Sequence, residues 1–148
     1  MESQGSRSMI YFARLLRSRA WSELVPDYAH TVLVSGYGDI NSSDYAAAAR
    51  TKSGSTVLIY TPTQRVLTVA MDQLTGASAR GWWYDPSTGV PTLIGDLPAQ
   101  GERQFTPPSQ QDWVLVLDNA AADLSPPGEI VPVETLRWGR MKLGFGRK

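Results

Sequence analysis

The sequence contains no cysteine, and this absence removes several kinds of chemistry from consideration. It excludes a disulfide framework, a thiolate nucleophile and a metal held by sulfur, and it leaves the redox compartment open. Only one histidine is present, whereas zinc usually requires several Cys or His ligands. The sequence therefore indicates neither a metal nor another cofactor.

A net charge is also missing, because 14 basic residues balance 14 acidic ones. Such a chain has no overall field that attracts nucleic acid or anionic lipid, so any such attraction must be local. The basic residues do gather near the two ends, within residues 7–19 and 137–148. No apolar run approaches the roughly 20 residues of a membrane span. Since no secretory signal is visible either, we expect a cytoplasmic protein from the sequence as written.

The chain of 148 residues, 42% of them hydrophobic, is long enough for one domain with a core. A helix is predicted from residue 6 to 21, because apolar residues recur there at intervals of three and four: Met9, Phe12, Ala13, Leu16 and Ala20. A basic amphipathic helix that carries a tryptophan can lie on a membrane surface. We favour the alternative that its apolar stripe covers a neighbouring sheet. Pro26 then ends the helical region.

Beyond residue 44 the pattern changes to short strand-like runs separated by turn residues. We predict strands at residues 45–51, 55–61, 65–70, 77–84, 90–94, 104–106 and 113–118. The turns at residues 52–54 and 85–89 contain glycines that can supply a positive φ. Seven short strands without helices between them predict an all-β fold, an antiparallel β-sandwich with one N-terminal amphipathic α-helix.

Few residues suggest catalysis or ion binding. His30 is not accompanied by a nucleophile motif and is interpreted as a surface or structural residue. Residues 39–44 carry closely spaced oxygen ligands but depart from the calcium-loop pattern, and Gly36 and Gly38 lack the lysine of a phosphate loop. The remaining carboxylates fall at predicted strand ends or in turns, and no pair among them suggests glycoside hydrolysis: Asp72, Asp85, Asp96, Asp112, Asp118 and Asp123. No catalytic residue is predicted.

Three adjacent aromatic residues, Trp82, Trp83 and Tyr84, lie on one predicted strand. Neighbouring side chains of a strand point to opposite faces, so Trp83 faces one way while Trp82 and Tyr84 face the other. One set can fill the space between the sheets, as can Trp113. The other set lies beneath the helix or is open to a ligand. Trp82, Tyr84 and Trp21 are therefore the candidate ligand-binding residues.

The composition changes again after residue 118. Residues 125–128, Ser-Pro-Pro-Gly, are typical of a linker, and the following segment mixes aromatic and basic residues. That segment could be a disordered tail, an added strand or an arm on a neighbouring chain. The predicted organisation is a helix and linker at residues 1–28, a β-sandwich at 29–118 and a C-terminal extension at 119–148.

Several segments carry a resemblance to a known family. They are residues 11–21 (YFARLLRSRAW), 25–27 (VPD), 47–51 (AAART), 81–89 (GWWYDPSTG), 105–108 (FTPP) and 112–118 (DWVLVLD). Together they resemble the domain called "putative collagen-binding domain of a collagenase", which follows a barrel in apiosidase-like glycoside hydrolases. The resemblance runs from about residue 6 to residue 118. It implies a small β-sandwich appended to a catalytic barrel, with residues 11–21 similar to the last barrel helix.

The family's catalytic carboxylates belong to the barrel, so the resemblance assigns none to this chain. It implies a non-catalytic accessory module that binds polysaccharide through Trp82, Tyr84 or Trp21, or that stabilises a partner glycoside hydrolase. An alternative is an oligomeric interaction protein whose basic ends bind a protein, nucleic acid or membrane. Fusion to a secreted enzyme would place the module outside the cell. Without its barrel the module would expose apolar surface, which predicts a homo-oligomer or a monomer capped by its C-terminal segment.

Overall fold

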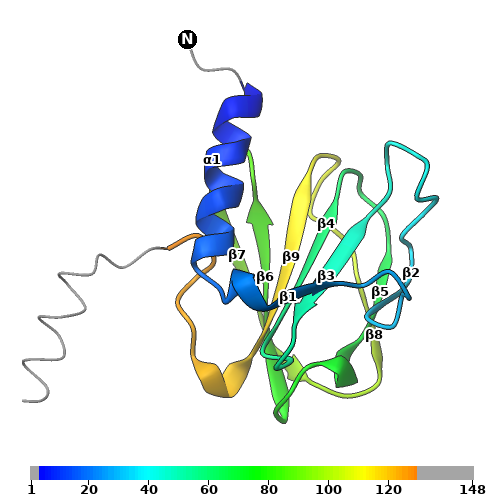
Figure 1. Cartoon of the computed structure of the whole chain (residues 1–148), viewed down its shortest axis with the longest axis vertical. Coiled ribbons are helices and arrows are strands. Elements are labelled where there is room, and N and C mark those ends of the chain that lie inside the picture. Colours follow the sequence, from blue (N-terminus) through cyan, green and yellow to red (C-terminus); the bar gives the residue numbers. More distant parts are fainter. Residues whose placement is uncertain (1–3, 130–148) are drawn as a thin grey trace, which may run out of the picture.

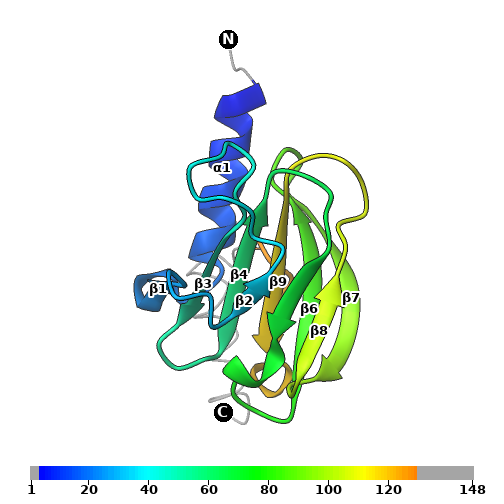
Figure 2. The same ribbon diagram turned by 90° about the vertical axis from the view of Figure 1, so that its right-hand side faces the viewer.

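The computed structural model describes residues 4–129, and the predictions made for residues 130–148 lie outside this part of the chain. Two antiparallel β-sheets face each other, with one long helix beside them (Figures 1 and 2). The larger sheet has six strands in the order β1-β3-β4-β9-β6-β7, and the smaller has three in the order β2-β5-β8. This confirms the predicted antiparallel β-sandwich with an N-terminal helix.

The helix α1 spans Gln4–Arg17, and short 3-10 turns occupy Trp21–Glu23, Met71–Gln73 and Ala120–Ala122. The strands are β1 (Leu24–Pro26), β2 (Leu33–Ser35), β3 (Ala47–Thr51), β4 (Thr56–Thr61), β5 (Leu67–Ala70), β6 (Ser78–Asp85), β7 (Val90–Pro98), β8 (Glu102–Phe105) and β9 (Trp113–Asn119). All seven predicted strands are present with shifted ends. β1 and β2 were not predicted, because three residues are too few to show a strand period. Pro26 is tolerated in β1 because this strand lies at a sheet edge.

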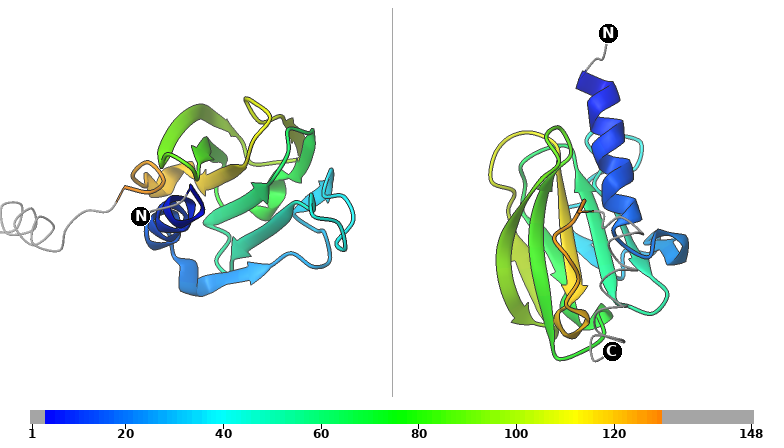
Figure 3. Two further views of the ribbon diagram at one scale, coloured as in Figure 1. Left: turned by 90° about the horizontal axis from the view of Figure 1, so that it is seen from above. Right: turned by 90° about the vertical axis from the view of Figure 1, so that its left-hand side faces the viewer.

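Both segments that flank the predicted sandwich contribute to it. Residues 24–26 pair with β3 as strand β1, although the sequence placed residues 1–28 in a helix and linker. After β9, the chain runs back beside the larger sheet toward α1, as the orange segment in Figure 3 shows. There the main-chain N–H of Gly128 donates to the hydroxyl of Ser18 at 3.0 Å. The packed unit therefore extends beyond residues 29–118 on both sides.

The main core lies between the two sheets. Ile59 and Leu115 from the larger sheet meet Leu67 from the smaller one, and all three are fully buried. Complete burial of an aliphatic side chain of this size contributes about 1.5–3 kcal/mol to stability. Trp83 and Trp113 lie in the same core with their rings in an edge-to-face arrangement, 6.3 Å apart at 69°. Large aromatic rings thus fill the space between the sheets, as predicted.

A second apolar cluster lies between α1 and the outer face of the larger sheet (Figure 3). The prediction that the helix covers a sheet is therefore confirmed, but its packed face differs from the predicted stripe. Leu15, which the stripe omitted, is fully buried, whereas Met9 is 76% exposed and Phe12 is 38% exposed. The first turns of α1 extend past the end of the sheets (Figure 2). The helix has apolar residues on two adjacent faces: the face with Leu15 packs on the sheet, and of the predicted stripe Leu16 also contacts this cluster.

Candidate interaction surfaces

The three aromatic residues of β6 point to alternating faces of the larger sheet. Trp83 faces the core between the sheets, whereas Trp82 and Tyr84 face the side that α1 covers. Tyr84 is fully buried, and its hydroxyl donates to the main-chain carbonyl of Tyr11 at 2.6 Å. Burial raises the pKa of Tyr84 to about 12. Since this ring has no face open to a ligand, the ligand-binding prediction narrows to Trp82 and Trp21.

Trp82 is partly buried beside an open groove of about 620 Å³ that Arg80, Asp96 and Asp123 also line. Its indole Nε1 is buried and has no hydrogen-bond partner among residues 4–129. Arg80 donates to Asp96 and to Asp123, each at 2.9 Å. The hydrogen bond from Arg80 is the main reason that the pKa of Asp96 lies below its usual value. The guanidinium of Arg80 thus binds both carboxylates that line this groove.

Trp21 lies in the 3-10 turn after α1 and is 57% exposed. This turn leads into β1 at one edge of the larger sheet, whereas Trp82 belongs to β6, on the far side of β3, β4 and β9. The two indole rings therefore cannot form one continuous platform. Any ligand held by Trp21 would meet a single ring at the sheet edge.

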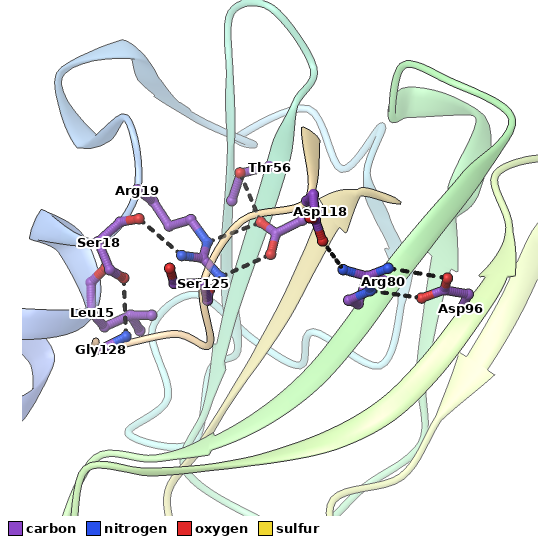
Figure 4. Close-up of polar contacts among 10 residues, drawn as sticks. Leu15, Ser18, Arg19, Thr56, Arg80, Asp96, Asp118, Ser125 and Gly128 are labelled. Carbon is purple, nitrogen blue, oxygen red and sulfur yellow. Dashed lines mark hydrogen bonds and ion pairs between the residues drawn. The ribbon is translucent and has the colours of Figure 1, made fainter. Parts of the chain in front are cut away.

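A buried ion pair joins the end of α1 to β9 (Figure 4). The Nε and Nη2 atoms of Arg19 donate to the two carboxylate oxygens of Asp118 at 3.0 and 2.8 Å, and the side chains are 0% and 3% exposed. The hydroxyl of Thr56 donates to the same carboxylate at 2.9 Å. Arg19 also donates to the main-chain carbonyls of Ser18 and Ser125. One guanidinium thus ties together the helix, the sheet and the segment that follows β9.

Burial raises the pKa of Asp118, although Arg19 and Thr56 favour its ionised form. The sequence placed Arg19 in a basic cluster and Asp118 at a strand end, and it did not predict their contact. The one local indication of a buried charge is the position of Asp118 at the end of an otherwise apolar predicted strand. Because the pair is buried and bidentate, α1 is held in a fixed position on the sandwich.

The outward face of α1 borders an apolar groove, which we name the α1 groove. Its lining residues are Met9, Phe12, Ala13, Leu16, Tyr60, Pro86 and Asp112, and its volume is about 500 Å³. A second hollow of about 250 Å³ shares Phe12, Leu16 and Tyr60 and extends the apolar surface to Leu24 and β3. Burial raises the pKa of Tyr60 to about 12, and the nearby Asp112 adds to this effect. Apart from the hydroxyl of Tyr60 and the carboxylate of Asp112, the residues that line the groove are apolar.

Within residues 4–129, no three Cys, His, Asp or Glu side chains lie close enough together to hold a metal ion. In the oxygen-rich segment 39–44, which departs from the calcium-loop pattern, Asp44 forms an ion pair with Arg65 at 3.3 Å. In the same range, no helix combines the length and the apolar character needed to span a bilayer.

These features define a small β-sandwich module with a helix fixed to its larger sheet and an apolar groove beside that helix. The sequence pattern of the family described as "Putative collagen-binding domain of a collagenase" matches residues 25–118. The chain belongs to this family. A search of curated proteins finds no match to the chain.

Two similar solved structures are glycoside hydrolases. One, described as "Glycoside hydrolase", is 26% identical with a TM-score of 0.71, and the match covers 81% of this chain and 26% of the other. The second, a glycoside hydrolase family 5 protein from Bacteroides vulgatus ATCC 8482, is 24% identical with a TM-score of 0.75 and matches 93% of this chain and 30% of its own. This chain therefore spans less than a third of either enzyme. The second match leaves out fewer residues than the 14 of α1, so the shared fold includes part of the helix.

Proposed function

We propose that the chain is a non-catalytic accessory module that docks through the α1 groove onto the catalytic domain of a glycoside hydrolase. The α1 groove carries this proposal, because it is an apolar hollow whose rim residues Met9 and Phe12 are well exposed. An exposed apolar surface of this kind on a folded module marks an interface. The ion pair of Arg19 with Asp118 supports a docking role, since it presents the helix in one orientation and so reduces the entropy lost on binding.

The comparisons suggest the class of partner. The similar enzymes are three to four times longer than the region they share with this chain, so most of each enzyme lies outside the module. The matching family is described as a binding domain, which supports a non-catalytic role. If the partner enzyme is secreted, the module acts outside the cell.

The proposal is tested with the 26%-identical glycoside hydrolase, prepared with and without the region that matches this chain. We expect this chain to co-elute with the shortened enzyme and to raise its thermal stability. A Phe12→Asp substitution should abolish both effects, because it places a charge in the apolar groove. Trp21→Ala, which removes an exposed ring outside the groove, is the matched control and should bind normally. Failure of this chain to bind, while the enzyme's own detached region does bind, would count against the proposal.

Self-association through the same groove is the competing explanation. Light scattering over a range of concentrations distinguishes the two, because a dimer that Phe12→Asp disrupts would show that the occupant is a second copy. The alternative based on basic ends loses one of its N-terminal charges, since Arg19 is buried in its ion pair, and its C-terminal residues 137–148 lie outside the described residues.

A further inference from the structure

The loops around β2 lie on the opposite side of the sandwich from α1 (Figures 1 and 3). These loops carry a cluster of aromatic side chains. The rings of His30 and Tyr37 are stacked in parallel, with centres 3.6 Å apart and an interplanar angle of 9°. Tyr45 meets His30 edge to face at 6.2 Å. Tyr28, two residues before His30, is 78% exposed. We name these four residues the aromatic cluster.

The first loop of the cluster is held firmly by one side chain. The carboxylate of Asp27 accepts hydrogen bonds from the main-chain N–H groups of Thr31, Val32 and Leu33, and from the hydroxyl of Thr31. His30 lies within this loop with a φ of 57°, a left-handed conformation that residues other than glycine seldom adopt. Strained backbone of this kind persists where the surroundings enforce it, and it is concentrated at functional sites. Here it accompanies the stacking of the imidazole on Tyr37.

A second side chain fixes the other loop. The guanidinium of Arg65 donates to the main-chain carbonyl of Gly36 at 3.1 Å and to that of Asp44, so it holds both ends of the loop that joins Tyr37 to Tyr45. The aromatic cluster is therefore organised before any ligand arrives. Because the loops are already ordered, ligand binding costs less conformational entropy, and this increases the affinity.

The polar tips of the cluster remain available. Tyr37 and Tyr45 both lie against His30, and burial is the main reason that the pKa of Tyr45 is raised. Within residues 4–129, none of the three tyrosine hydroxyls takes part in a hydrogen bond, and none is shut off from solvent. Tyr37 packs partly against the main core and anchors the cluster, whereas Tyr28 is largely exposed. The cluster thus offers the ring surface of Tyr28 and unbonded tyrosine hydroxyls to a ligand.

We propose that the aromatic cluster binds a neutral polysaccharide. The C–H face of a pyranose packs on an aromatic ring, while its hydroxyls exchange hydrogen bonds with phenol and imidazole groups, so amphipathic rings suit this ligand. The carboxylate of Asp27 is held within the loop that carries His30, and its negative charge disfavours acidic sugars there, which favours a neutral chain. This binding site is separate from the α1 groove and does not depend on docking to an enzyme.

The test is affinity electrophoresis of the full chain in gels that contain β-glucan, xylan, mannan or galactan, with polygalacturonate and gelatin gels alongside. We expect retardation in at least one neutral gel and none with polygalacturonate. Tyr28→Ala and Tyr37→Ala should weaken that binding by about tenfold. Tyr37→Phe, which keeps the stacked ring, should lose less. Val90→Ala, at an exposed position of β7 outside both the cluster and the α1 groove, should bind like the wild type.

Three results would overturn the proposal. They are the absence of binding to all four neutral polysaccharides, neutral-sugar binding that Tyr28→Ala and Tyr37→Ala leave unchanged, and cluster-dependent binding to gelatin instead. Tyr28→Ala keeps the test valid if Tyr37→Ala fails to fold, because Tyr28 is largely exposed. None of these three results bears on docking, which Phe12→Asp tests separately.

Discussion

Arg19 and Asp118 lie 99 residues apart in the sequence and form a two-point ion pair inside the folded chain. Removing one charge leaves the other buried and unpaired, which is more costly than the pair itself is stabilising. We therefore expect Asp118→Asn to reduce the free energy of unfolding by about 3–5 kcal/mol in urea titrations. The double variant Arg19→Met with Asp118→Leu should lose less than either single variant. The control is Asp96→Asn at the exposed pair with Arg80, and an equal loss there would show that burial is not the cause.

Two residues of α1, one turn apart, should lose different amounts of stability on truncation. Leu15 is fully buried against the larger sheet, so Leu15→Ala should reduce stability by about 2–5 kcal/mol. Phe12 is 38% exposed at the rim of the α1 groove, and Phe12→Ala should change stability much less. Thermal unfolding of both variants measures the difference. Equal losses would mean that the helix packs through both faces.

Alkaline unfolding should depend on Tyr84, whose pKa is raised from 10.0 to about 12 in the folded chain. Between these two values the folded state holds the proton more tightly than the unfolded state. The stability that the neutral hydroxyl contributes is therefore complete below pH 10 and is lost as the pH rises toward 12. Tyr60 acts in the same direction.

We expect the urea midpoint of the wild type to fall above pH 10, and to fall less steeply in Tyr84→Phe. At neutral pH the same variant should lose about 0.5–1.5 kcal/mol, because the carbonyl of Tyr11 loses its donor. Tyr28→Phe, at an exposed tyrosine, should follow the wild type at every pH. A Tyr84→Phe curve parallel to the wild type would contradict the assignment.

Gly128 should tolerate no side chain. Its φ is +85°, and an added Cβ would lie 2.7 Å from the ring of Tyr84. Gly128→Ala should therefore cost more than the about 1–2 kcal/mol of a left-handed alanine. Gly101→Ala is the matched control, with a φ of +69° and open space around the new Cβ. Urea unfolding compares them, and an equal cost would show that residues 124–129 do not pack on Tyr84.

The sequence predicts the sandwich because its signals are local. Short apolar runs such as residues 113–118 and the glycines in the turns define the strands, and the period of two places Trp83 opposite Trp82 and Tyr84. The buried face of α1 could not be chosen in this way. Met9, Phe12 and Leu16 make one apolar stripe, but Tyr11 and Leu15 make another beside it, and only the position of the sheet decides between them.

The candidate sites depend on contacts between distant residues. Nothing near Arg19 in the sequence indicates Asp118, and both are ordinary surface residues by type. The aromatic cluster joins His30 to Tyr37 and Tyr45 across an irregular loop that has no periodic pattern. The loops are held in place by hydrogen bonds with the side chains of Asp27 and Arg65. The sequence does not predict these contacts.

The perpendicular indoles of Trp83 and Trp113 also give the protein a built-in optical signal. Two tryptophan chromophores 6.3 Å apart couple their electronic transitions, which produces a circular dichroism band that depends on their mutual angle. Since both rings lie between the sheets, this band reports the closure of the sandwich itself. Solvent-exposed Trp21, outside that interior, contributes instead to fluorescence that changes when its edge of the sheet is covered.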